Sequence, residues 1–169
     1  GKSQTTRYLL ELLEARGVSA VVLRHPMPYD PDLSSQAVQR FASFDDLDLA
    51  RCTIEEREEY EPYVARGHIV YAGVDYRAVL ERAEREADVI LWDGGNNDLP
   101  LVRPNLYLVL TDPHRPGDTV RYWPSRAQLR LADAVLIAKS RSAPAAAVIS
   151  ERELVARLAP RATRCGRAT

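Results

Sequence analysis

The sequence predicts an α/β fold of three layers, in which a mostly parallel sheet carries helices on both faces. Short apolar segments of strand length alternate with segments of helical character along most of the chain. Apolar strands that alternate with helices are buried on both faces, and this order is typical of parallel sheets. With 169 residues and 46% hydrophobic content, the chain is large enough for one such core.

The first half of the chain has clearly marked helix ends. A helix is expected from Gln4 to Arg16, because leucines repeat on one side and Gly17 follows as a left-handed stop. Thr53 and Glu56 have the spacing of a capping box, and Gly67 ends that helix. The other elements expected in this half are strands at 18–24 and 68–72, a short helix at 34–42 capped by Ser34 or Ser35, and a helix at 75–86 capped by Asp75.

Three further strands are expected in the second half, at 88–92, 106–110 and 134–137. The sequence after residue 140 is rich in Ala, Ser and Pro, and only 151–158 has a helical pattern. We therefore expect residues 141–169 to form a divergent or frayed tail.

Bulk properties exclude several classes of protein. The net charge is -1 and the pI is near 6.4, so nothing in the charge balance predicts nucleic-acid binding. No segment approaches the roughly 20 apolar residues of a membrane span. The two cysteines lie far apart, as in proteins of reducing compartments. We therefore expect a cytoplasmic protein without a membrane or nucleic-acid partner.

The tripeptide Gly1-Lys2-Ser3 matches the second half of a phosphate-binding P-loop, G-x-x-x-x-G-K-[S/T]. In that motif Lys2 contacts the β- and γ-phosphates and Ser3 binds Mg²⁺, while backbone N–H groups near Gly1 hold phosphate oxygens. Gln4 and Thr5 complete the predicted nucleotide-binding set. A plain helix start capped by Ser3 is the alternative. Because the preceding strand and half-loop are absent, residues 1–140 are expected to form a partial P-loop NTPase-like domain.

Asp93 is the second predicted catalytic residue, because it ends an apolar strand where a carboxylate needs a metal or donors. Its expected role is to bind Mg²⁺ together with Ser3. Gly94 follows and lets the backbone approach a phosphate. Alternatively, Asp93 caps a glycine-rich turn. Asn96, Asn97 and Asp98 either bind substrate hydroxyls or shape that turn.

Basic side chains follow two of the predicted strands. In parallel sheets the ligand lies beyond the carboxyl ends of the strands, and arginine donors fit phosphate oxygens. We therefore predict that a phosphorylated substrate binds to Arg24, His25, Arg40, His114 and Arg115.

Six longer strings follow one another in order: Arg24-His25-Pro26-Met27-Pro28-Tyr29, Gln36-Ala37-Val38-Gln39-Arg40-Phe41, Cys52 to Pro62, Tyr71 to Tyr76, Asp88 to Asp98 and Asp112 to Gly117. Together they resemble the cyclic 2,3-diphosphoglycerate synthetase family, described also as predicted P-loop GTPases. The resemblance implies ATP as co-substrate, Mg²⁺ as cofactor, and closure of an intramolecular phosphoanhydride in 2,3-diphosphoglycerate with release of ADP and phosphate.

The chain departs from that family near the last strand. The family pattern there resembles Ile-Asn-Lys-x-Asp, whose Asp reads guanine in GTPases, whereas this chain has Arg141 at that place. We therefore expect ATP rather than GTP. The alternatives are a P-loop GTPase or metallochaperone-like switch, and a catalytically inactive nucleotide-binding relative. The sheet edge left by the missing strand favours a homodimer.

Overall fold

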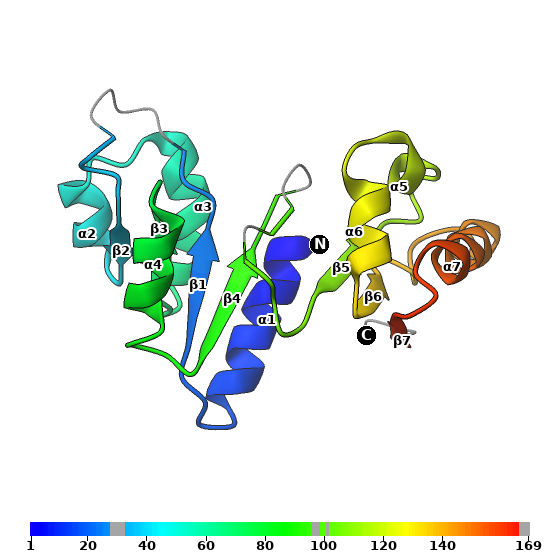
Figure 1. Ribbon diagram of the computed structural model, residues 1–169, viewed down its shortest axis with the longest axis horizontal. Helices are drawn as coiled ribbons and strands as arrows, with labels where there is room; N and C mark the ends of the chain where they lie inside the picture. The colour runs from blue at the N-terminus through cyan, green and yellow to red at the C-terminus, as the bar shows by residue number, and fades with distance from the viewer. Residues whose placement is uncertain (28–32, 96–98, 101, 166–169) are drawn as a thin grey trace. The chain divides into compact units, whose positions relative to one another are not determined.

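A computed structural model describes residues 1–27, 33–95, 99–100 and 102–165, with the side chains of 163–165 excepted. The chain forms two compact units, one of Lys2–Gly94 and one of Gly95–Thr169 together with Gly1. Each unit has its own sheet with helices (Figure 1), so the predicted α/β class is confirmed. The described strands form a four-stranded and a three-stranded sheet rather than one continuous sheet.

The sheet of the first unit is mixed, with three parallel strands and one antiparallel edge strand. Its order is β2-β3-β1-β4, and β2 is the antiparallel strand. The register pairs Arg24 with Asp93 at the carboxyl ends of two neighbouring parallel strands. The strands are β1 (Ala20–Arg24), β2 (Gln39–Phe41), β3 (Val70–Ala72) and β4 (Val89–Asp93).

Helices cover both faces of this sheet (Figure 1). On one face, Leu10 of α1 and Tyr60 and Tyr63 of α3 pack with Val22 in one core. On the other face, Val79 of α4 packs in a second core with Val21, Leu23 and Tyr71. This layering is compatible with the predicted three-layer fold. The helices are α1 (Lys2–Glu14), α2 (Phe44–Leu49), α3 (Ile54–Val64) and α4 (Tyr76–Ala83).

The predicted helix ends are confirmed in this unit. The Thr53 side chain accepts from the Glu56 N–H, and the Glu56 carboxylate accepts from the Thr53 N–H at 2.8 Å. Asp75 caps α4. Gly17 and Gly67 have φ values of 69° and 78°, which are left-handed conformations that glycine adopts at little cost. Local capping chemistry was therefore sufficient to place these ends.

The helix expected at 34–42 is wrong. Residues 33–36 form turns, and Gln39–Phe41 forms β2, with Arg40 opposite Tyr71. Phe41 is 1% exposed and stacks on Tyr60. Pairing with the edge of β3 and burial of one aromatic ring outweigh a weak local helical preference. A strand of three residues is too short to show an alternating pattern.

The second unit has a fully parallel sheet of order β5-β6-β7. Val135 of β6 packs with Leu129, Val155 and Leu158 in the core of this unit. Residues expected to be a divergent or frayed tail thus include a helix of 14 residues and a strand paired with β6. The elements are β5 (Leu108–Thr111), α5 (Asp118–Arg121), α6 (Ser125–Leu131), β6 (Ala134–Ile137), α7 (Ala145–Leu158) and β7 (Thr163–Cys165).

Candidate functional site

The carboxyl ends of β1 and β4 hold a buried ion pair. Arg24 Nη1 lies 2.5 Å from Asp93 Oδ2 and also donates to the Asp93 carbonyl at 3.0 Å. The Asp93 side chain is 1% exposed and that of Arg24 is 12% exposed. A buried carboxylate needs such partners because its desolvation is costly. The parallel register therefore sets up the pair directly.

Tyr63 of α3 connects this pair to the start of α1. Its hydroxyl donates to Asp93 Oδ2 at 2.5 Å, and the Ser3 side chain lies near enough to lower the pKa of Tyr63 slightly. Burial, followed by the hydrogen bond and the negative charge of Asp93, raises the pKa of Tyr63. The phenol therefore stays protonated and remains a donor at neutral pH. Ser3 and Asp93, which the sequence pairs as metal ligands, thus both lie near the Tyr63 hydroxyl.

A second carboxylate completes the surroundings of Arg24. Glu59, one helical turn before Tyr63 on α3, pairs with Arg24 Nη2. Among the described residues, Arg24 Nε is buried without a hydrogen-bond partner. One guanidinium therefore lies between two carboxylates and still has an unused donor at the sheet edge.

The first turn of α1 presents the P-loop-like residues. Lys2 and Gln4 are exposed, whereas Ser3 and Thr5 are half-buried. Gly1 precedes the helix, and the N–H groups of its first turn have no partners within the helix. Such a helix start favours anions. The roles predicted for Gly1, Lys2, Ser3, Gln4 and Thr5 in nucleotide binding stay predictions.

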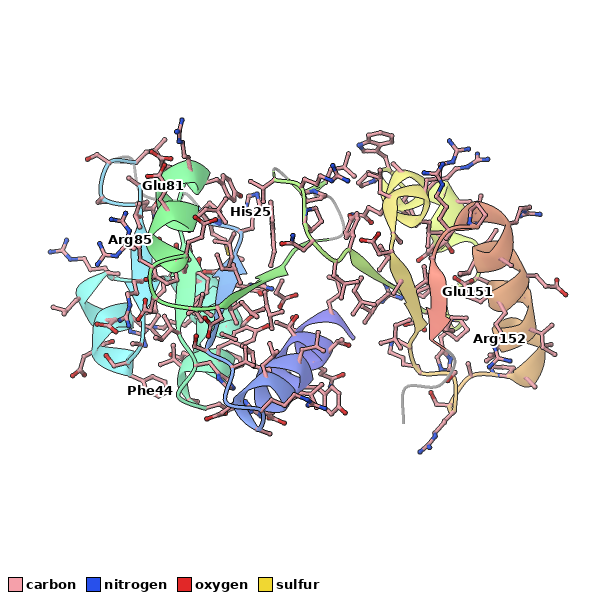
Figure 2. The ribbon with its side chains drawn as sticks, turned by 60° about the horizontal axis from the view of Figure 1, so that its bottom comes forward. His25, Phe44, Glu81, Arg85, Glu151 and Arg152 are labelled. Atoms are coloured by element: carbon pink, nitrogen blue, oxygen red, sulfur yellow. The ribbon has the colours of Figure 1, made fainter. Side chains whose placement is uncertain are left out.

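The opposite face of the same edge is aromatic. The ring of Tyr76 stacks on Trp92 with centroids 5.8 Å apart, and His25 meets Tyr76 edge-on at 6.1 Å. A Cβ at Gly94 would lie 3.3 Å from Trp92 Nε1, so the glycine permits close approach of backbone and indole. The sequence prediction named His25 as a substrate ligand and expected Tyr76 to be a half-buried packing residue. His25 itself lies beside α4 in Figure 2.

Arg40 does not join Arg24 at this edge. Its guanidinium pairs with Glu86, and the Tyr71 hydroxyl donates to the same carboxylate. Glu86 follows α4 and precedes β4, so it lies toward the amino ends of the parallel strands. The hydrogen bonds from Arg40 lower the pKa of Glu86 to about 2. The structure thus gives Arg40 a partner away from Asp93.

His114 and Arg115 belong to the second unit, where they follow β5. His114 Nε2 lies 3.0 Å from Ser142 Oγ, and Lys139 Nζ lies 2.5 Å from Asp112 Oδ2. The single substrate face predicted from the sequence is therefore distributed over two units.

Glu151 of α7 is a buried acid that the sequence prediction missed. It is 4% exposed, and Thr119 donates to its carboxylate at 3.2 Å. Burial raises the pKa of Glu151. Its position one turn before Val155 in α7 is the pattern that would have predicted an inward side chain.

The described residues contain no cluster of three or more His, Cys, Asp or Glu side chains that could hold a metal. A magnesium ion at Ser3 and Asp93 would therefore need water and ligand phosphates to complete its shell, as is usual for Mg²⁺. Asn96, Asn97 and Asp98 lie outside the described residues. Within the described part of the chain, no helix has the length and apolar character that a membrane span requires.

Comparison with known proteins gives one strong match. The chain is 54% identical over 163 residues to arginine synthetase ArcE of Thermococcus kodakarensis. The match covers 96% of this chain and 36% of that protein, so the chain spans little more than a third of its relative. No family model matches the chain.

Proposed function

We propose that this chain is part of an ATP-dependent synthetase. The buried cluster of Asp93, Arg24 and Tyr63, with Ser3 near the Tyr63 hydroxyl, supports this proposal most strongly. It brings a helix start, a strand-end carboxylate and a buried guanidinium to the sheet edge where α/β proteins bind ligands. The synthetase name of a relative with 54% identity supports the same class.

In this proposal Lys2 and the first turn of α1 bind the ATP phosphates. Ser3 and Asp93 would hold Mg²⁺, which would offset charge on the transferred phosphoryl group. Arg24 pairs with the buried Asp93 carboxylate and positions it at the sheet edge. Tyr63 orients the Asp93 carboxylate by hydrogen bonding to Oδ2.

Arginine is the first product to test, because the relative is named an arginine synthetase. The chemistry required is activation of a carbonyl oxygen by phosphoryl transfer. A nitrogen nucleophile then forms the new C–N bond as the C–O bond breaks and phosphate leaves. A site that binds ATP and stabilises charge on phosphate oxygens suits the first half of that reaction.

Cyclic 2,3-diphosphoglycerate is the second candidate product, favoured by the strings from Arg24-His25-Pro26 to Asp112-Pro113-His114. One phosphate of 2,3-diphosphoglycerate would be activated by ATP, and the other would displace inorganic phosphate to close the ring. Both candidate reactions use the same phosphoryl donor, so the two differ in the acceptor alone.

The test compares Asp93→Asn with Asp88→Asn, a matched change at the exposed residue that immediately precedes the same strand. In titration calorimetry with Mg²⁺, the affinity for ATP should fall about tenfold or more in Asp93→Asn and less than about twofold in Asp88→Asn. Equal affinities in both variants would refute the site.

Product assays then separate the candidates. Arginine with ADP and phosphate should yield ATP in the reverse direction if arginine is the product, whereas 2,3-diphosphoglycerate with ATP should yield the cyclic compound in ³¹P NMR spectra. A preference for GTP without either reaction would favour the switch-type NTPase, and no nucleotide binding would favour the inactive relative.

A further inference from the structure

Four arginines line a hollow in the second unit that the proposed function does not use. Arg126 and Arg130 come from α6, Arg157 comes from α7, and Arg161 follows α7. The hollow has a volume of about 340 Å³, and its other lining residues are Leu158 and Pro160. The two helices pack against each other, as Figure 1 also shows. Residues separated by about 30 positions thus form one basic surface, hereafter the arginine hollow.

The positive charge of the arginine hollow is not neutralised within the described part of the chain. No ion pair involves any of its four arginines there, and its described lining contains no acidic residue. The nearest acids in the sequence are Asp133, three residues after Arg130, and Glu153, one turn before Arg157 on α7. Neither forms an ion pair with these arginines in the described part of the chain. Like charges at i and i+4, as in Arg126 and Arg130, oppose folding by a few tenths of a kcal/mol.

Helix ends explain only part of this arrangement. Arg130 and Arg157 lie in the last turns of α6 and α7, where the helix dipole favours a cation. Arg126 lies in the first turn of α6, where the dipole disfavours a cation. Arg161 lies beyond the end of α7. Helix dipoles therefore do not account for all four arginines at one hollow, and a bound anion would offset their mutual repulsion.

The second unit as a whole also carries excess positive charge. Residues 95–169 contain 12 Lys and Arg against 6 Asp and Glu, whereas residues 2–94 contain 11 Lys and Arg against 18 Asp and Glu. The second unit therefore has an excess of positive charge that attracts polyanions.

We infer that the arginine hollow binds a small molecule that carries two or more phosphate groups. Guanidinium forks match phosphate oxygens in pairs, so four of them can serve at least two phosphates. The volume lies at the lower end of the range for small-ligand pockets. The lining has no aromatic side chain on which a base could stack, so a single-stranded nucleic acid is the less suitable occupant.

Calorimetry with inorganic tripolyphosphate at low ionic strength tests the inference. The Arg130→Gln/Arg157→Gln double variant should bind tripolyphosphate about tenfold or more weakly, since each lost charge-assisted bond costs substantial affinity. Arg152→Gln is the matched control, because Arg152 lies on α7 (Figure 2), is exposed, and is not one of the residues that line the hollow. Asp93→Asn should keep tripolyphosphate binding, which separates this site from the proposed ATP site.

Chemical modification gives a second measurement on the unaltered protein. Phenylglyoxal modifies accessible arginines, and tripolyphosphate should protect Arg126, Arg130, Arg157 and Arg161 in peptide mass spectra while leaving Arg152 reactive. If Arg152 were protected as strongly, or if Arg152→Gln lost as much affinity as the double variant, binding would be non-specific charge attraction and the inference would be wrong. Tighter binding of an octathymidylate than of tripolyphosphate would overturn the inference in favour of a nucleic-acid surface.

Discussion

Replacing Arg24 by Met should lower the free energy of unfolding of the first unit more than replacing any exposed charged residue of that unit. The replacement leaves the Asp93 carboxylate, 1% exposed, with Tyr63 as its remaining side-chain hydrogen-bond donor among the described residues. Removing one member of a buried ion pair typically costs about 3–5 kcal/mol. Arg24 also contacts the partly exposed Glu59, and release of that acid to water reduces the net loss. We therefore expect about 3 kcal/mol.

Fluorescence can follow this unit alone. The chain has two tryptophans, and Trp123 in the second unit is 77% exposed, so Trp123→Phe should be well tolerated. In that background Trp92 reports urea unfolding of the first unit from within the sheet. The Arg24→Met and Asp93→Leu single variants and their double variant then complete a thermodynamic cycle.

The cycle should show a coupling free energy of about 2 kcal/mol or more, because the double variant removes both charges and leaves neither buried alone. Additive losses would mean that the two side chains do not depend on each other. That result would refute the buried pair as the organising feature of the site.

Three further predictions concern the same unit. Because the pKa of Glu86 is about 2 in the folded protein and 4.5 ordinarily, its ionised carboxylate stabilises the wild-type fold above pH 4.5. The wild type loses this free energy of unfolding as the pH falls from 4.5 to about 2. Glu86→Gln should abolish this pH dependence. Because Glu86 and Arg40 are partly solvent-exposed, we expect only about 1 kcal/mol between urea titrations at pH 3 and pH 6. Gly73→Ala should cost about 3 kcal/mol in urea titrations, since φ is 156° and the new methyl would collide with the Ala37 carbonyl; a loss below 1 kcal/mol would contradict that backbone geometry. Thr53→Ala should cost about 1 kcal/mol by removing one half of the α3 cap, while Thr53→Ser should restore most of it.

Local signals in the sequence were sufficient for most of the fold. Capping residues such as Thr53 and Asp75 act over three or four residues, so their spacing carries the information. The apolar run before Asp93 likewise predicted both a strand and a polar edge. β2 was mistaken because its pairing with β3 is a non-local interaction that three residues cannot encode.

The site was predicted in part for the same reason. A strand-end rule places Asp93 and Arg24 together, and the parallel register confirms that they are neighbours. It cannot show that Tyr63, from a helix, donates to Asp93 and lies near Ser3. Arg40 also follows the chemical pattern of a substrate ligand, yet Glu86 and Tyr71 bind it from elements distant in sequence. Contacts between separate elements, rather than residue chemistry, account for these differences.

The unequal distribution of charge has a consequence for how the protein is handled. A pI near 6.4 describes the average of an acidic unit and a basic unit. If a protease separated the two units, isoelectric focusing should send the fragments to opposite ends of the pH gradient. Neither fragment would focus where the intact chain does.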